Sequence, residues 1–144
     1  MVTLVAIHPQ GVPVSASYVS TGEAYDITSA YLSDDSRPHE IDRATMLWLD
    51  EEGFFCEIES IYPPQVEVAP CSYSKSLVRQ EGFPQLQENV LHGNVVVQRD
   101  NDGFILWLEK GLTVNKIIQC ENDQFLFSDN ILAGISAYHA EIEK

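Results

Sequence analysis

The sequence predicts an all-β or mainly β protein, an antiparallel sheet or meander built of two similar halves, with one or two short helices near residues 72–91. Segments rich in valine, isoleucine and aromatic residues recur along the chain and alternate with polar positions, as half-buried strands do. Clusters of Gly, Asp and Asn separate these segments at spacings that suit tight hairpins. Helical signals are scarce and short.

Two pairs of strands are expected in the first half. Val2–Ile7 is apolar and β-branched, and Val12–Ser20 alternates between apolar and small polar residues. Arg43–Leu49 and Phe54–Tyr62 flank the four residues Asp50-Glu51-Glu52-Gly53. This loop suits a hairpin in which the glycine adopts a positive φ.

Two more hairpins are expected in the second half, because acidic or amide turn residues again separate strand-like segments. The strands are Asn94–Arg99 with Phe104–Leu108, and Gln124–Phe127 with Ile131–Tyr138. About ten strands are expected in total, in a single domain of residues 1–144.

Between the halves, Ser72–Gln80 is expected to form a short helix, and Gln85–Leu91 a second. Three prolines make residues 63–71 a stiff connector. The flanking halves resemble one another: with small gaps, residues 25–62 align with 101–138, so that Leu47-Trp48 falls on Leu126-Phe127 and Ile58 on Ile135. We interpret this match as an internal repeat.

Charge is the most unusual property of the chain. The 144 residues contain 8 Lys and Arg against 22 Asp and Glu, a net charge of −14. Such a surface repels phosphate backbones and anionic lipid, which argues against direct binding to nucleic acid or membranes. It attracts a basic protein and accelerates the encounter with it.

The acidic residues are concentrated in one part of the chain. Residues 1–22 have no charged side chain, whereas residues 23–67 contain twelve acids against Arg37 and Arg43. This concentration favours a local acidic face over uniform solubilisation. We expect the partner-binding residues in the hairpin that spans residues 43–62 and in the loop before it: Asp34, Asp35, Asp50, Glu51, Glu52, Glu57 and Glu59.

The three cysteines, Cys56, Cys71 and Cys120, are an odd number without paired spacing, so we expect neither a disulfide framework nor a zinc site. The first residues lack the basic and long apolar segments of a signal peptide. A cytoplasmic location is therefore expected. No nucleophile, phosphate-binding or dinucleotide motif occurs, and we expect no catalytic residue, cofactor or metal.

Residues 25–61 resemble a short bacterial β-rich domain of unknown function. The resemblance rests on Tyr25-Asp26, Tyr31-Leu32 and the run from Met46 to Ile61, where that family reads roughly LDLDEDGRVVGIEIL. It departs at Glu57, where the family has glycine. The resemblance implies a β-rich fold and no activity.

In overall character, small, acidic and without motifs, the chain resembles bacterial immunity proteins that block a toxic partner. We therefore expect a non-enzymatic binding protein that neutralises a basic partner, such as a nuclease toxin. Alternatives are a phage-type inhibitor that mimics nucleic acid, and a small β-barrel that binds a ligand or catalyses a reaction at an unrecognised site.

Overall fold

The computed structural model describes residues 1–19, 21, 23–71, 78–89, 93–138 and 141–143. Within this part the chain is all-β, and no described residue lies in a helix. The strands are β1 (Val2–His8), β2 (Val14–Val19), β3 (Ala24–Ser29), β4 (Arg37–Glu40), β5 (Thr45–Leu49), β6 (Phe55–Ile61), β7 (Gln65–Val68), β8 (Val78–Glu81), β9 (Phe83–Glu88), β10 (Val96–Arg99), β11 (Gly103–Trp107), β12 (Lys116–Cys120), β13 (Asp123–Ser128), β14 (Ile131–Tyr138) and β15 (Glu141–Glu143).

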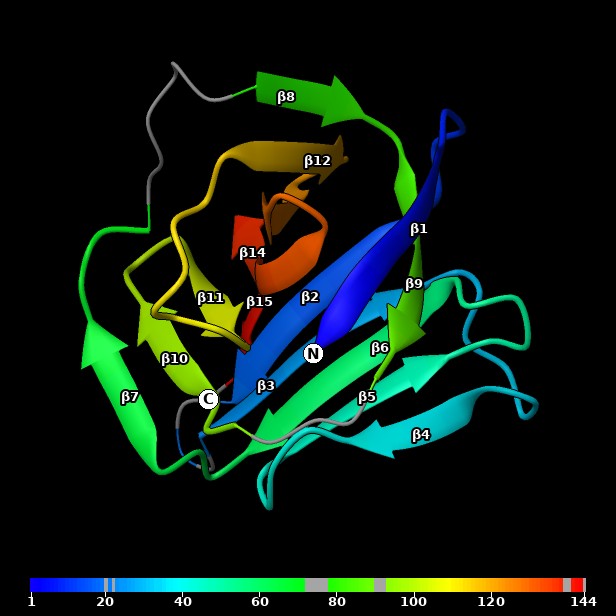
Figure 1. Cartoon of the computed structure of the whole chain (residues 1–144). Helices are drawn as coiled ribbons and strands as arrows, with labels where there is room; N and C mark the ends of the chain where they lie inside the picture. Colours follow the sequence, from blue (N-terminus) through cyan, green and yellow to red (C-terminus); the bar gives the residue numbers. More distant parts are fainter. Residues whose placement is uncertain (20, 22, 72–77, 90–92, 139–140, 144) are drawn as a thin grey trace.

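The strands form two sheets (Figure 1). The six-stranded sheet has the order β15-β2-β3-β6-β5-β4. The nine-stranded sheet has the order β7-β10-β11-β14-β13-β12-β8, and β1 joins it through β14 and carries β9 on its other side. The pairs β7–β10, β8–β12 and β15–β2 are parallel, and the other pairs are antiparallel.

Four consecutive strands of each sheet are arranged in the same order. β3 to β6 are arranged as β3-β6-β5-β4, and β11 to β14 as β11-β14-β13-β12. The β5–β6 ladder has a bulge between Trp48 and Leu49, and the β13–β14 ladder has one between Leu126 and Phe127. The strand that follows each set of four joins the other sheet, where it pairs with the strand that precedes the other set. Thus β7 pairs with β10, and β15 pairs with β2. Positions in one sheet can therefore be compared with positions in the other through the pairing register.

The main hydrophobic core lies between the two sheets. The six-stranded sheet contributes Tyr25, Ile27, Leu47 and Ile58, all fully buried. The nine-stranded sheet contributes Phe104, Leu106, Phe125, Phe127 and Ile135 to the same cluster. The rings of Phe55 and Phe125 make an edge contact with centroids 5.3 Å apart, and those of Tyr25 and Phe104 lie 5.2 Å apart. One face of each sheet is thus occupied by the core, which leaves the outer faces for other roles.

The eight strands that the sequence located are confirmed, with differences of at most two residues at their ends. The expected total of about ten is too low, since the described residues form fifteen strands, and β1 and β2, expected as a pair, lie in different sheets. The predicted hairpin loop after β5 is also confirmed: Gly53 has φ of +93°. A Cβ atom at Gly53 would lie 2.3 Å from the carbonyl oxygen of Leu86, so only glycine fits. Asp50 closes the loop by accepting hydrogen bonds from the N–H groups of Glu52 and Phe54, both at 2.9 Å.

The predicted helices are wrong where the structure describes them. Of the helix predicted over Gln85–Leu91, Gln85–Glu88 belongs to β9, in which Phe83 and Leu86 are buried against the core, and residues 90 and 91 lie outside the described part. Of the helix predicted over Ser72–Gln80, residues 78–80 belong to β8, and residues 72–77 lie outside the described part. Both segments pair with strands distant in sequence, β1 and β12, and this pairing overrides local preference. The predicted stiff connector contains another strand, β7.

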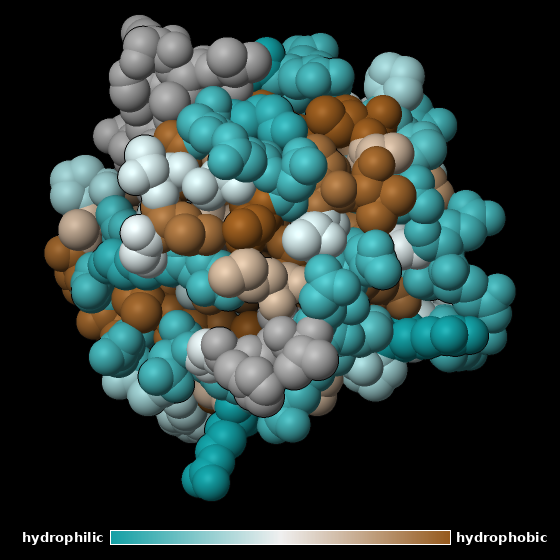
Figure 2. Space-filling model, viewed as in Figure 1, coloured by the Kyte–Doolittle hydropathy of each residue, from teal (hydrophilic) through white to brown (hydrophobic). Residues whose placement is uncertain are grey.

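The described residues contain no helix long and apolar enough to cross a membrane. Hydrophilic side chains cover most of the face shown in Figure 2, and hydrophobic side chains are visible between them.

Candidate functional site

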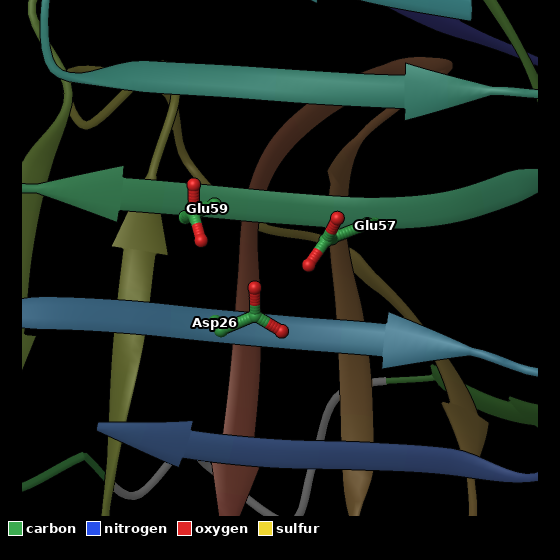
Figure 3. A group of neighbouring side chains, drawn as sticks. All are labelled: Asp26, Glu57 and Glu59. Atoms are coloured by element: carbon green, nitrogen blue, oxygen red, sulfur yellow. The ribbon is translucent and has the colours of Figure 1, made fainter. Parts of the chain in front are cut away.

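The outer face of the six-stranded sheet carries a cluster of carboxylates at its centre. Asp26 lies on β3, and Glu57 and Glu59 lie on the neighbouring strand β6. Ile27 and Ile58, which alternate with these acids, are fully buried in the core, so the acidic side chains project from the opposite face. In Figure 3 the carboxylate of Asp26 lies across the strand boundary from those of Glu57 and Glu59.

The strand register brings the three carboxylates together. Asp26 is directly opposite Glu59, and Thr28 is directly opposite Glu57. One oxygen from each carboxylate lies within 4.8 Å of the others. The hydroxyl of Thr28 lies 2.5 Å from Oδ1 of Asp26 and 3.2 Å from Oε2 of Glu57, so it can donate to either acid. We call Asp26, Glu57 and Glu59 the acidic cluster.

No Lys, Arg or His in the described part of the chain forms an ion pair with the acidic cluster. Burial, together with the hydrogen bond and negative charge of Asp26, raises the pKa of Glu57 to about 8. Burial and the charge of Asp26 also raise the pKa of Glu59. Glu57 therefore carries a proton for most of the time at pH 7, and a cation beside it would favour release of that proton.

Partly exposed apolar side chains border the acidic cluster on β5. Met46 is directly opposite Glu59, and Trp48 is directly opposite Glu57. At the end of β6, Ile61 is 45% exposed. Aromatic, Met and other apolar side chains beside charged groups are typical of protein interfaces.

The corresponding face of the nine-stranded sheet has a different character. Ile105 on β11 is directly opposite Ser136 on β14, and this pair occupies the place that Asp26 and Glu59 occupy on β3 and β6. Here Ile105, Trp107, Ile117 and Leu126 form a second apolar cluster, which Cys71, Leu112 and Val114 from the connecting segments help to bury. The chain itself covers this outer face. The six-stranded sheet instead presents partly exposed acids and Trp48 at the equivalent positions.

The structure divides the seven predicted binding residues into two groups. Glu57 and Glu59 belong to the acidic cluster. Asp34, Asp35, Glu51 and Glu52 are exposed in the loops at the end of the sheet where β3 ends and β6 begins. In these loops Asp35, Asp50, Glu51 and Glu52 line a shallow depression with Tyr31 and Phe54.

Two of the predicted acids in the loops already have partners. The carboxylate of Asp50 is engaged by the backbone of its own turn. Glu51 lies 3.8 Å from Arg37 in an ion pair whose side chains are both largely exposed. Asp26, which completes the acidic cluster, was missed by the sequence analysis. The alternation in the segment A-Y-D-I-T-S is the signal that could have found it.

Carboxylate oxygens at this separation could also hold a divalent cation, because Mg²⁺ and Ca²⁺ prefer oxygen ligands. Within the described residues, Asp26, Glu57 and Glu59 are the group of potential ligands that lie close enough together. The arrangement can therefore accept a positive charge, either as an ion or as a side chain of a partner.

Comparison with known proteins gives no family for this chain: no family model matches it, and no curated protein has a significantly similar sequence. The resemblance of residues 25–61 to a bacterial domain therefore stays a prediction from those residues.

Proposed function

We propose that this protein is a non-enzymatic binding protein that docks and neutralises a basic protein partner through the outer face of its six-stranded sheet. An immunity protein that inhibits a toxin such as a nuclease would act in this way. The observation that carries the proposal is the acidic cluster, three neighbouring carboxyl groups without a cationic partner in the described chain, bordered by Met46 and Trp48.

The energetics of the acidic cluster favour such a partner. Three carboxylates held this close repel one another, and protonation of Glu57 relieves that repulsion only in the free protein. A lysine or arginine from a partner would relieve it in the complex, while Met46 and Trp48 would exclude water around the new ion pair. A nuclease suits this role because its substrate-binding surface is basic.

We also propose that the two sheets derive from one duplicated unit. The shared strand order, the bulges in equivalent ladders and the reciprocal crossover of β7 and β15 support this proposal. In this account one outer face became apolar and was covered by connecting segments. The other stayed uncovered by the described chain and acquired the acidic cluster.

The test compares two sets of charge-removing substitutions for binding to a basic partner, beginning with the product of the neighbouring gene. The first set is Asp26→Asn, Glu57→Gln and Glu59→Gln. We expect it to weaken binding about 100-fold, because it removes carboxylates that pair at the centre of the interface. Toxin neutralisation should be lost in parallel.

The control set is Glu81→Gln, Asp102→Asn and Glu109→Gln, which replaces the same number of acids in the second half of the chain. It should weaken binding less than about threefold, since charges distant from the acidic cluster act only through the screened overall field. If the two sets weaken binding equally, the acidic cluster acts only through its contribution to the net charge, and the proposal is overturned.

A further inference from the structure

A hollow of about 830 Å³ lies at one end of the outer face of the six-stranded sheet. It is formed by the turn between β4 and β5, the segment that follows β6, and residues 93–94. Two exposed apolar side chains line it: Ile61 is 45% exposed and Tyr62 is 69% exposed. Large apolar side chains that stay exposed next to one another at a concave surface are typical of binding sites.

The hollow continues the acidic cluster along strand β6. Side chains two residues apart on a strand leave the same face about 7 Å apart, so Glu57, Glu59 and Ile61 form one row. In Figure 3 Glu59 lies closer than Glu57 to the arrowhead of β6, the end at which Ile61 lies. Beside this row, Met46 is opposite Glu59, and the carbonyl of Ala44 accepts the N–H of Ile61 at 2.9 Å. The acidic cluster and the hollow therefore belong to one surface.

Hydrogen bonds hold the walls of the hollow in place. The carboxylate of Asp42 accepts the N–H groups of Ala44 and Val95, both at 2.8 Å, and so joins the β4–β5 turn to the segment before β10. The N–H of Tyr62 donates to the carbonyl of Glu23 at 3.0 Å. The hollow is thus formed before a partner arrives, which lowers the entropy cost of binding.

The backbone conformation of Tyr62 does not suit its side chain. Its φ is +50°, in the left-handed region that a bulky residue rarely adopts and that glycine adopts readily. The ring gains little from burial in return, because most of it is exposed. Strained residues of this kind cluster at functional sites and ligand clamps, so the strain at Tyr62 indicates that the ring itself is used.

The charges around the hollow favour a basic occupant. Among the described residues that line it, Glu40 and Asp42 are acidic and Arg43 is basic, and the acidic cluster lies directly beyond Ile61. An extended segment of a partner presents alternate side chains to one face at the same spacing as β6 does. A lysine or arginine and an aromatic residue two positions further along would therefore meet Glu59 and the hollow together.

We propose that the hollow receives an aromatic side chain of the basic partner, carried on an extended segment whose lysine or arginine, two residues away, pairs with the acidic cluster. The ring packs against Ile61 and Tyr62, and the carboxyl groups fix the position of the segment along β6. This inference rests on the proposed function and adds the sequence pattern of the partner segment, a basic and an aromatic residue separated by one position.

The test uses two acetylated and amidated peptides as probes: Lys-Thr-Lys-Thr-Phe-Gly, and the same peptide with alanine in place of phenylalanine. Its two lysines have the spacing of Glu57 and Glu59. Affinities come from amide chemical shifts of the whole protein during titration. We expect the phenylalanine peptide to bind about tenfold more tightly, as an aromatic anchor in a pocket should. The amides of Ala44 and Ile61 should shift with this peptide and not with the alanine peptide.

Substitutions at Tyr62 separate the ring from the fold. Tyr62→Gly removes the ring and suits the positive φ, so it should melt at or above the wild-type temperature, and it should reduce the tenfold preference to less than about twofold. Tyr62→Asn, which also tolerates this φ, replaces it if the glycine variant folds poorly. Val68→Ser is the matched control: it removes an apolar side chain that is 74% exposed on β7 of the other sheet, and it should keep the tenfold preference.

Two kinds of failure can be told apart. The inference is overturned if the wild type binds neither peptide, if it binds both equally, or if a folded variant at Tyr62 keeps the preference for phenylalanine. Failure of the proposed function has a different sign: the variant with Asp26→Asn, Glu57→Gln and Glu59→Gln would then bind both peptides as tightly as the wild type does.

Discussion

The carboxyl groups of Asp26, Glu57 and Glu59 are neighbours because the backbone brings them together. Antiparallel pairing places Asp26 opposite Glu59, and alternation along β6 places Glu57 two residues away on the same face. Like charges directly opposite one another weaken a sheet. The buried side chains on the other face of β3 and β6 compensate for this cost.

The pKa of Glu57 reports how close the carboxyl groups of the acidic cluster lie to one another. We expect its carboxyl carbon to titrate in NMR with a midpoint near 8, because burial and Asp26 both oppose ionisation. Asp26→Asn should lower the midpoint by about one pH unit or more, since it removes the neighbouring charge. Glu40→Gln, on β4, is the control and should leave the midpoint unchanged. An ordinary midpoint near 4.5 in the wild type would show that the side chains are not close together.

The candidate residues show what a sequence can and cannot indicate at this scale. Glu57 and Glu59 are two apart on a recognisable strand, so their shared face could be predicted. Asp26 could not be assigned to the same site, because the pairing of β3 with β6 spans the long segment that contains β4 and β5. Asp50 has the same charge as its neighbours, but its role in the turn depends on hydrogen bonds that composition does not reveal.

Strand β4 forms the outer edge of the six-stranded sheet, next to the candidate site. The N–H of Ile41 donates inward to the carbonyl of Thr45, so by alternation the backbone nitrogens of Pro38 and Glu40 face outward. Pro38 has no N–H to offer to another strand. Proline at such a position protects an edge against association. In the other sheet the equivalent strand, β12, is covered by β8.

Removing this protection should promote self-association. In Pro38→Thr the edge regains an outward N–H on a residue that favours β structure. We expect the variant to form dimers or larger species at about 100 μM in sedimentation velocity, while the wild type sediments unchanged with concentration. Gln65→Thr, on the edge strand β7, is a control that creates no new donor. A variant at Pro38 that also sediments unchanged would show that the edge is protected in another way.

Hairpins were predictable because each consists of two strands joined by a short loop with characteristic residues. Gly53 after Asp50 and Gly103 after Asp100 are examples, and both loops are closed by the preceding aspartate. β8 and β9 were missed because their partners, β12 and β1, are distant in sequence. Gly82 joins these two strands, and Pro84 is the second residue of β9.

At the scale of the whole molecule, the decisive feature is which sheet face the chain covers. Strand alternation predicts two faces for each sheet, but it does not say which segment covers an outer face. The covering of Ile105, Trp107 and Leu126 depends on connecting residues such as Leu112 and Val114, whose sequence has no periodic signal. The concentration of acids in residues 23–67 did indicate the correct sheet for the acidic cluster, because β3 to β6 all lie within this range.

The pattern of charge also predicts how binding responds to salt. If the acidic cluster meets a basic surface, association should be fast at low ionic strength and slow down as salt is added, because the Debye length falls from about 10 Å at 0.1 M to about 3 Å at 1 M. Dissociation should change less, since ion pairs enclosed by Met46 and Trp48 are screened weakly.

The most direct test of the proposed binding face is an amide chemical-shift map of the protein with and without one equivalent of its basic partner. We predict that the largest changes fall on β3, β5 and β6, around Asp26, Trp48 and Glu57, and that β10 to β14 change little. Under the same conditions, the variant with Asp26→Asn, Glu57→Gln and Glu59→Gln should show no comparable changes. Changes confined to the nine-stranded sheet, or an unchanged map for that variant relative to the wild type, would contradict the account.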